Sequence, residues 1–249
     1  MLKICEIHKK IGEKYILNNI NLQIQQGESI VIIGESGGGK TTLAKIIAGI
    51  ESPSKGTLYY CNEELLDSRK RAFSQCGDIQ YIFQDPYSSL EKNYTVRKTL
   101  LEPFNICKRN GRSALNPEEA MAMVDKDLLE YMDCKIDILS GGQRQKVAIA
   151  RALVPMPKVI IADECTAMLD ADSSQDIFSV FQRLNEERNI TIIAIVHEID
   201  FLRGFWKRII VVKEGTIIED MLFKDFYYEA KDEYSKEIIQ CYQVKLGFR

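Results

Sequence analysis

Apolar and polar residues alternate along the first part of the chain, and this pattern predicts β-strands. Apolar residues recur along the stretch 15–24, at Ile16, Ile20, Leu22 and Ile24. A turn at Gln26-Gly27 follows. The next run, 29–33, is short and rich in β-branched apolar residues, which is typical of a buried central strand.

The spacing changes to that of helices after residue 34. Leu43, Ile46 and Ile47 lie on one face of a helix that follows a glycine-rich loop. From about 90 to 138 the pattern is helical and polar, which predicts an inserted helical subdomain with core contacts at Leu100, Leu101, Met121, Val124, Leu128 and Leu129. Helices at 141–154 and 172–187 then alternate with strands at 159–163, 190–196 and 208–215. This alternation predicts an α/β fold with a mostly parallel sheet.

Charge and cysteine content narrow the function classes. Among 249 residues, 33 Lys and Arg stand against 36 Asp and Glu, so the net charge of −3 gives no bulk electrostatic reason to expect nucleic acid as a partner. The seven cysteines are scattered without a Cys-x-x-Cys pair, which suits reduced thiols in the cytoplasm. No stretch approaches the roughly 20 apolar residues of a membrane-spanning helix.

A phosphate-binding loop is the first chemical motif. The segment 34–41 matches G-x-x-x-x-G-K-[ST], follows an apolar strand and opens a helix. Its N–H groups and the helix N-terminus favour an anion, Lys40 can reach the outer phosphates, and the Thr41 hydroxyl can ligate Mg²⁺. The residues expected at the nucleotide are Gly34, Ser36, Gly37, Gly38, Gly39, Lys40, Thr41 and Thr42. The alternative is a chance glycine-rich turn.

Two carboxylates end the apolar strand 159–163. Asp163 fits a role in holding Mg²⁺, and Glu164 fits a role in polarising the water that attacks the γ-phosphate. An ordinary acidic turn in solvent is the alternative. Ligands of open α/β sheets bind at such carboxyl ends of strands, which favours the active-site interpretation.

A second exposed helix start lies at residues 139–143, Leu-Ser-Gly-Gly-Gln. Ser140 and Gln143 have the spacing of a capping box, and Gly141 and Gly142 leave the N–H groups accessible to an anion. The capping pattern by itself is equally compatible with an ordinary capped helix.

Together these segments resemble the ABC ATPase family. The resemblance rests on the loop 34–41, IFQDP with Gln84, LSGGQ, VIIADE, Leu169-Asp170 and His197, which occur in the family's order and extend over essentially the whole chain. It implies a P-loop NTPase (RecA-like) core within a single ABC ATPase domain, 1–249. Its expected parts are a β subdomain at about 1–30 and 56–82, a helical subdomain at about 86–154, a nucleotide-binding core at 29–55 and 155–220, and C-terminal helices at 221–249.

The resemblance also implies roles for individual residues. ATP and Mg²⁺ are the expected ligands, with Ser140, Gly141, Gly142 and Gln143 binding the γ-phosphate of ATP held on a second module. Gln84 resembles the residue that contacts Mg²⁺ or the attacking water. Asp170 resembles the aspartate that crosses the dimer interface, and His197 resembles the histidine that contacts the γ-phosphate.

At two positions the chain departs from the family pattern. Where an aromatic residue usually stacks on adenine, the chain has Ile11, and Tyr15 is the nearest aromatic alternative. Where proline usually follows the catalytic glutamate, the chain has Cys165, which is expected to alter the turn after the strand.

The segments IQYIFQDPYSSL, TVRKTLLEP and DEYSKEII are similar to those of peptide and nickel importers. This similarity implies an ATPase that energises transport from the inner face of the cell membrane. The expected partners are polytopic membrane subunits, a second ABC module, identical or homologous, and indirectly an extracytoplasmic substrate-binding protein. Two alternatives remain: a non-transport ABC ATPase of DNA repair, chromosome or translation work, and a regulatory module that does not hydrolyse ATP.

Overall fold

The structure is a computed structural model that describes residues 1–65, 71–196 and 205–245. The chain forms two compact units: Met1–Arg71 with Thr191–Arg249, and Ala72–Ile190. The first unit therefore combines the two ends of the chain, and the second is continuous. Among the described residues, no helix has both the length and the apolar composition needed to cross a membrane.

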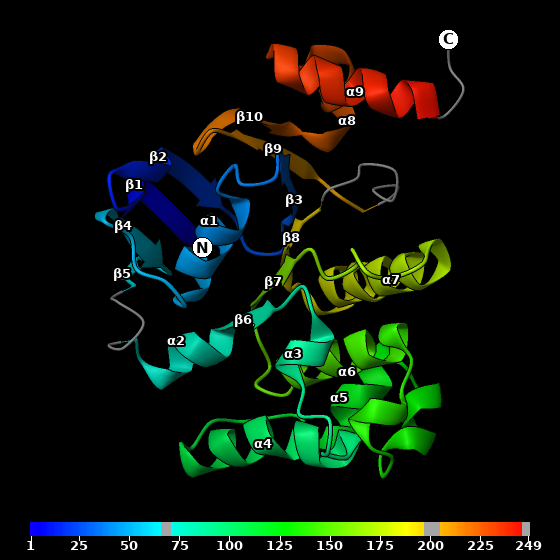
Figure 1. Cartoon of the computed structure of the whole chain (residues 1–249). Helices are drawn as coiled ribbons and strands as arrows, with labels where there is room; N and C mark the ends of the chain where they lie inside the picture. Colours follow the sequence, from blue (N-terminus) through cyan, green and yellow to red (C-terminus); the bar gives the residue numbers. More distant parts are fainter. Residues whose placement is uncertain (66–70, 197–204, 246–249) are drawn as a thin grey trace. The chain divides into compact units, whose positions relative to one another are not determined.

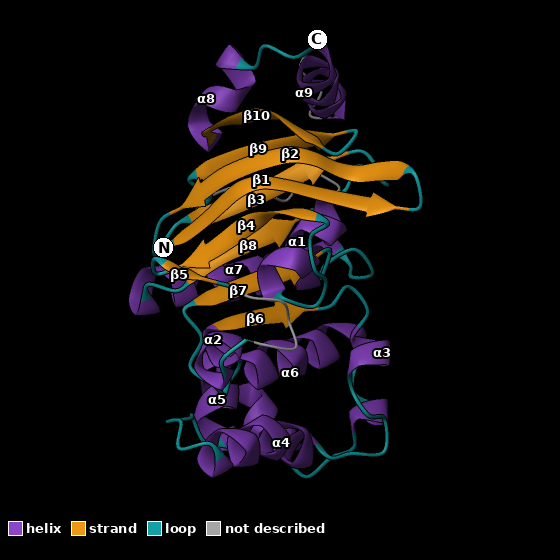
Figure 2. Ribbon diagram, turned by 90° about the vertical axis from the view of Figure 1, so that its left-hand side faces the viewer, coloured by secondary structure: helices purple, strands orange, loops and turns teal. Residues whose placement is uncertain are grey.

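An antiparallel sheet forms the N-terminal part of the first unit (Figure 2). Its strands, in the order β2-β1-β4-β5, are β2 (Lys14–Ile24), β1 (Leu2–Ile11), β4 (Lys55–Tyr60) and β5 (Glu63–Glu64). The alternating apolar residues of β2 face inward, because Leu17, Ile20, Leu22 and Ile24 are all buried. The strand pattern expected at 15–24 is thus present, with Leu17 buried in place of the half-buried Ile16. β-Bulges along β1 shift the register there.

A parallel arrangement forms the rest of the first unit. β3 (Ser29–Gly34) pairs in parallel with β8 (Thr191–Ile195) and β9 (Arg208–Lys213), and β10 (Thr216–Leu222) pairs with β9 antiparallel. Residues 30–33 of β3 are at most 2% exposed, as the β-branched run predicts for a central strand. Helix α1 (Lys40–Ala48) follows β3, and α8 (Phe223–Glu229) and α9 (Glu233–Lys245) follow β10 (Figure 1).

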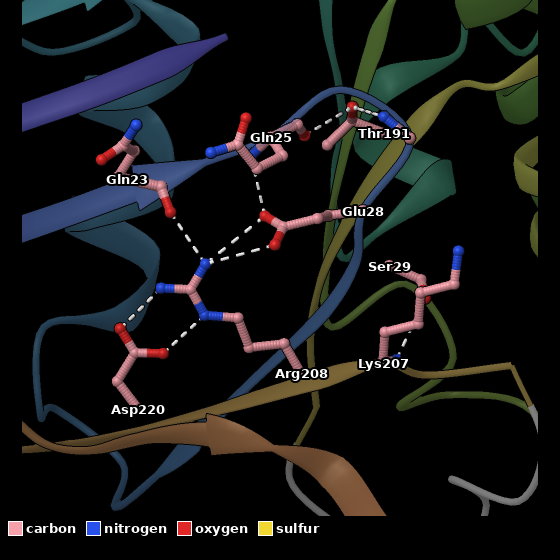
Figure 3. A network of polar contacts seen from close by, with 9 residues as sticks. Gln23, Gln25, Glu28, Ser29, Thr191, Lys207, Arg208 and Asp220 are labelled. Carbon is pink, nitrogen blue, oxygen red and sulfur yellow. Dashed lines mark hydrogen bonds and ion pairs between the residues drawn. The ribbon is translucent and has the colours of Figure 1, made fainter.

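A network of hydrogen bonds and ion pairs connects β2 to the β9–β10 hairpin in this unit (Figure 3). The Arg208 guanidinium donates from Nε and Nη2 to the two carboxylate oxygens of Asp220, at 2.5 and 2.6 Å. Its Nη1 donates to the Gln23 carbonyl oxygen at 2.8 Å and lies 3.4 Å from Glu28 Oε2. Because these acceptors raise the pKa of Arg208 further, the guanidinium is charged at every relevant pH.

The second unit is mostly helical around one parallel strand pair. β6 (Ile79–Ile82) pairs with β7 (Val159–Asp163). The helices are α2 (Phe73–Asp78), α3 (Pro86–Ser89), α4 (Val96–Arg109), α5 (Pro117–Val124), α6 (Gly141–Leu153) and α7 (Ala171–Arg188), with 3₁₀ turns η2 (Asp127–Tyr131) and η3 (Ile136–Ile138). The helices expected at 141–154 and 172–187 match α6 and α7 to within one residue at each end.

The core assignments within 90–138 need one correction. Leu100, Met121, Val124 and Leu128 are buried, and Leu101 is half-buried, but Leu129 is 37% exposed. The prediction was wrong at Leu129 because residues 127–131 form a 3₁₀ turn rather than an α-helix. A 3₁₀ turn repeats every three residues, so a face assigned with the α-helical period drifts off the core.

Candidate functional site

The phosphate loop of the first unit turns sharply between β3 and α1, and its backbone requires glycine at both ends. Gly34 has a φ of 145° and Gly39 a φ of 102°. A Cβ at Gly34 would lie 1.9 Å from the Val212 carbonyl oxygen, and one at Gly39 would lie 2.7 Å from the Ile16 carbonyl oxygen. Two of the motif's glycines are therefore needed for close backbone approach as well as for the turn itself.

Lys40 is the first residue of α1, at the end of this loop. Its side chain is almost fully buried, and Nζ donates to the carbonyl oxygens of Gly34 and Glu35, each at 2.8 Å. Helix α1 starts here without a side-chain cap and without an acidic residue in its first turn. Ser36 and Gly37 are exposed, Gly38 is buried, and Thr41 and Thr42 are half-buried. A buried ammonium beside an uncapped helix N-terminus attracts phosphate.

The loop is held in place by the β9–β10 turn, a support that the sequence motif does not reveal. The Gly215 N–H donates to the Gly38 carbonyl oxygen at 3.0 Å, and the Glu214 N–H donates to Glu35 Oε1 at 3.3 Å. The Gly215 carbonyl in turn accepts from the Asn18 N–H at 2.8 Å. The loop, the turn and β2 are thus hydrogen-bonded within the first unit, and only folding brings them together.

The two candidates for adenine contact lie on the β1–β2 hairpin. Ile11 is 62% exposed and Tyr15 is 46% exposed, so both have accessible surface. The Lys10 ammonium lies 4.2 Å from the Tyr15 ring centroid, where a cation–π interaction covers one ring face. Tyr15 directly precedes Ile16, whose carbonyl approaches Gly39. The hairpin therefore lies beside the phosphate loop.

In the second unit, β7 ends at the two predicted carboxylates. Asp163 is 5% exposed and accepts a hydrogen bond from the Tyr81 hydroxyl. Glu164 has a φ of 49°, in the left-handed region that non-glycine residues rarely adopt. The backbone therefore leaves the extended strand conformation at Glu164, directly after β7 ends at Asp163. Strained residues of this kind cluster at functional sites, and the strain is consistent with the role predicted for Glu164.

Cys165 stands in the turn after Glu164. The Ala167 N–H donates to the Glu164 carbonyl at 3.0 Å, so the turn closes without proline. Burial raises the pKa of Cys165 to about 12, and the thiol is therefore protonated near neutral pH. The Gln145 side-chain amide of α6, fully buried, lies beside this thiol. Cys165 thus packs as a neutral side chain.

The helix start at Ser140 has the predicted capping box. The Gln143 N–H donates to Ser140 Oγ at 3.3 Å, and the Ser140 N–H donates to Gln143 Oε1 at 2.9 Å. A Cβ at Gly142 would lie 3.2 Å from Ser173 Oγ, so glycine permits close packing against the start of α7. Gly141 and Gly142 are both half-buried.

Arg144 binds the segment that precedes this helix start, a role that the sequence analysis did not predict. Its Nε and Nη2 donate to the carbonyls of Ile136 and Asp137 at 3.0 and 2.6 Å, and its guanidinium lies 4.2 Å from the Tyr87 ring centroid. Tyr87 belongs to α3, which follows Gln84. One guanidinium thus joins the segment after Gln84 to the segment before Ser140, because an arginine fork can donate to two carbonyls while it stacks on a ring.

The remaining predicted residues are placed as follows. Asp170 caps α7, accepting from the Ser173 N–H at 2.8 Å and its hydroxyl at 3.0 Å, and these bonds lower the pKa of Asp170 below its usual range. Gln84 is exposed in the turn between β6 and α3. His197 lies outside the described residues.

A groove of about 240 Å³ lies beside Gln84 in the second unit. Residues of β6, α3, α4 and α6 line it, among them Tyr81, Phe83, Pro103 and Arg151. Phe83 is 45% exposed, and Arg151 Nη1 donates to the Ser89 carbonyl at 3.0 Å. The groove therefore offers apolar surface with an arginine at its edge.

Comparison with known proteins identifies the family. The profile of the ABC transporter family matches residues 17–167, which include the phosphate loop, Ser140 and Glu164. The chain belongs to this family. ABC ATP-binding proteins are ATPases, so this chain is an ATP-binding protein and an ATPase.

Individual relatives agree with this assignment. The chain is 33% identical over 215 residues to the nickel import ATP-binding protein NikE of Escherichia coli strain 536, covering 84% of this chain and 79% of that protein. It is 32% identical over 250 residues to the putative oligopeptide transport ATP-binding protein YkfD of Bacillus subtilis, covering 96% and 74%. A dimeric, post-hydrolysis structure of the ATP-binding cassette MJ0796 bound to ADP and Pi matches with a TM-score of 0.75 and 32% identity, covering 89% and 98%.

These structural matches also confirm the expected fold class. The ABC ATPase cassettes share the P-loop fold, and the parallel strands and antiparallel sheet described above agree with it. The residue roles stay predictions, and the structure adds Tyr81, Arg144 and the Glu214–Gly215 turn to the residues that support them.

Proposed function

We propose that this ABC ATPase energises an importer of the peptide or nickel type, with two modules closing over two Mg-ATP molecules. The observation that carries the proposal is the buried Lys40 ammonium within a glycine loop that ends in an uncapped helix start. The nickel and oligopeptide relatives support the importer class. The longest described helix, α7, has 18 residues, which leaves no room in the described part of the chain for the long coiled coil of a chromosome ATPase.

The donor set suits magnesium held together with a nucleotide. The described residues contain no group of three or more His, Cys, Asp and Glu side chains able to hold a metal. Thr41, Gln84 and Asp163 offer a hydroxyl, an amide and a carboxylate oxygen, which are hard ligands of the kind that Mg²⁺ prefers when phosphates complete its coordination. When bound, the ion would neutralise charge that develops on the phosphates.

Different residues of the chain bind the phosphates and activate the attacking water in this proposal. Lys40 binds the outer phosphates, and Glu164 polarises the attacking water and accepts its proton. The backbone changes conformation at Glu164, directly after Asp163, and in this proposal Asp163 holds the metal while Glu164 serves as the base. In this proposal Gln84 contacts the attacking water, and His197 contacts the γ-phosphate.

A second module completes each site. Ser140, Gly141, Gly142 and Gln143 bind the γ-phosphate of ATP held on the partner's loop, and Asp170 crosses the interface. Two apolar residues on the same segments, Ile138 and Met168, are each 65% exposed. Closure of two modules over these segments would cover both side chains in this proposal. The dimeric cassette MJ0796 supports this arrangement.

Membrane subunits dock in the groove beside Gln84 under this proposal. The exposed Phe83 and Tyr87, each 45% exposed, supply aromatic surface of the kind enriched at interfaces. The protein would then lie on the inner face of the cell membrane, with an extracytoplasmic substrate-binding protein acting through the membrane subunits.

The decisive variant is Glu164→Gln. It should retain ATP binding and reduce turnover by at least about 100-fold, because the amide cannot accept the proton of the attacking water. It should also elute as a dimer with Mg-ATP, since the closed state no longer reopens through hydrolysis. Size-exclusion chromatography and a phosphate-release assay measure both effects. Wild-type turnover in Glu164→Gln would exclude the assigned role.

A further inference from the structure

Tyr81 is a side chain to which the proposed mechanism gives no task. It lies on β6 and pairs with Ile161 of the neighbouring strand β7, two residues before Asp163. From this position its hydroxyl donates a hydrogen bond to Asp163 Oδ2. The acceptor is the carboxylate that the proposed function assigns to magnesium, and it is 5% exposed. A donor on one oxygen restricts rotation of the carboxylate, so the direction of the other oxygen is fixed as well.

The ring of Tyr81 makes a different contact. It packs edge-to-face with the Phe83 ring, with ring centroids 4.8 Å apart and an interplanar angle of 66°. Both rings line the groove beside Gln84, and Phe83 is 45% exposed there. An edge-to-face pair has a preferred geometry, so the orientation of one ring constrains the other. A single side chain therefore connects the wall of the groove to the buried carboxylate.

We propose that Tyr81 is a positioning residue that orients Asp163 for magnesium and makes this orientation depend on the groove. The inference deepens the proposed function and rests on it. An outer hydrogen-bond donor that orients a metal ligand typically changes metal affinity by about 10- to 100-fold. The groove wall acts through Phe83, because movement of that ring alters the packing of Tyr81 and hence the hydroxyl that holds Asp163.

The test measures how much Mg²⁺ tightens nucleotide binding, without turnover. The full chain is titrated with the fluorescent, non-hydrolysable analogue mant-AMPPNP, with Mg²⁺ and with EDTA. Tyr81→Phe removes only the hydroxyl, and we expect the Mg²⁺-dependent gain in affinity to fall by about 10-fold or more, while affinity in EDTA stays within about twofold of wild type. Asp163→Asn, which removes the carboxylate charge itself, should show the largest loss of the Mg²⁺-dependent gain in affinity. Tyr228→Phe, at a tyrosine 90% exposed on α8, is the matched control and should behave as wild type.

Phe83→Ala tests the link to the groove. It should reduce the Mg²⁺-dependent gain by a smaller factor, about two- to threefold, because the hydroxyl remains but its ring loses a neighbour. An unchanged gain in Phe83→Ala would overturn the link to the groove.

Three results would contradict either the orienting role of Tyr81 or the proposed function. A Tyr81→Phe protein with the wild-type Mg²⁺ gain, or one weakened equally in Mg²⁺ and EDTA, would overturn the orienting role. Thermal unfolding of the wild-type and Tyr81→Phe proteins shows whether equal weakening in Mg²⁺ and EDTA comes from general destabilisation. A wild-type chain that binds no mant-AMPPNP at all would contradict the proposed function itself.

Discussion

At the scale of single residues, the phosphate loop depends on the absence of a side chain. A Cβ at Gly34 would lie 1.9 Å from a backbone oxygen of β9, which cannot move without breaking the parallel pairing of β3 and β9. Gly37 in the same loop also has a positive φ, 78°, but nothing lies within 4 Å of its Cβ position. Both glycines therefore have a positive φ, but only Gly34 lacks room for a side chain.

This difference gives a prediction for stability. Gly34→Ala should lower the free energy of unfolding by more than about 3 kcal/mol, because the strain of the backbone is added to a clash with backbone. Gly37→Ala is the matched control and should cost about 1 kcal/mol, the backbone strain alone. Urea unfolding monitored by circular dichroism measures both values. Equal losses in the two variants would show that the approach of Val212 is unimportant.

Residue-level assignments succeeded where a motif has an internal geometry. The Ser140–Gln143 box needs only local backbone, and it formed as predicted. Tyr81 and Arg144 were missed because their partners, Asp163 and Tyr87, are distant in sequence and nothing in the local pattern marks them. The left-handed φ of Glu164 likewise has no sequence signal, since glutamate has no preference for that region.

At the scale of elements, α5 and α6 begin with the same device. Asn116 and Glu119 form a capping box at α5, as Ser140 and Gln143 do at α6. The Glu119 N–H donates to Asn116 Oδ1 at 2.8 Å. The box at Ser140 belongs to the proposed nucleotide site, and the box at Asn116 does not. Comparing the two therefore distinguishes the effect of helix capping from that of ligand binding.

Alanine at the two caps should therefore have different consequences. Ser140→Ala and Asn116→Ala should each lower the free energy of unfolding by about 1 kcal/mol, the usual cost of losing an N-cap side chain. Only Ser140→Ala should also reduce the ATPase rate, by about 10-fold or more, because its hydroxyl is proposed to contact the γ-phosphate. Thermal unfolding and phosphate release are measured on the same preparations. A similar loss of activity in both variants would assign Ser140 a capping role alone.

Elements with long, regular periodicity were predicted well, and short ones less so. The 18 residues of α7 extend over five helical turns, so the apolar stripe defines the helix clearly. Segments as short as η2 carry too few repeats to separate a period of three from one of 3.6, which is why Leu129 was placed in the core.

At the scale of the whole molecule, the proposed sites are shared between two copies. A mixing experiment tests this sharing. Lys40→Ala and Gly142→Asp should each be inactive alone, since every site in either dimer lacks one half. Mixed one to one, about a quarter of the sites should combine an intact loop with an intact Ser140 segment. ATPase activity should therefore recover to about a quarter of wild type on mixing. No recovery at any ratio would contradict a site shared between two copies of this chain.

The sequence by itself determined the family of this protein and its activity as an ATPase. A glycine loop before a helix, two carboxylates at a strand end and LSGGQ at a capped helix are local patterns, because each needs only neighbouring residues to adopt its backbone. The alternating apolar pattern likewise determined the α/β class.

Tertiary structure decided which distant groups support those motifs. The Glu214–Gly215 turn hydrogen-bonds the phosphate loop, and Tyr81 holds Asp163, across separations of 82 residues or more. Such contacts depend on strand order and register, which set the positions of side chains and backbone groups far apart in the chain. A one-residue shift of β6 against β7 would turn Tyr81 to the opposite face, so only the folded pairing places its hydroxyl on the carboxylate.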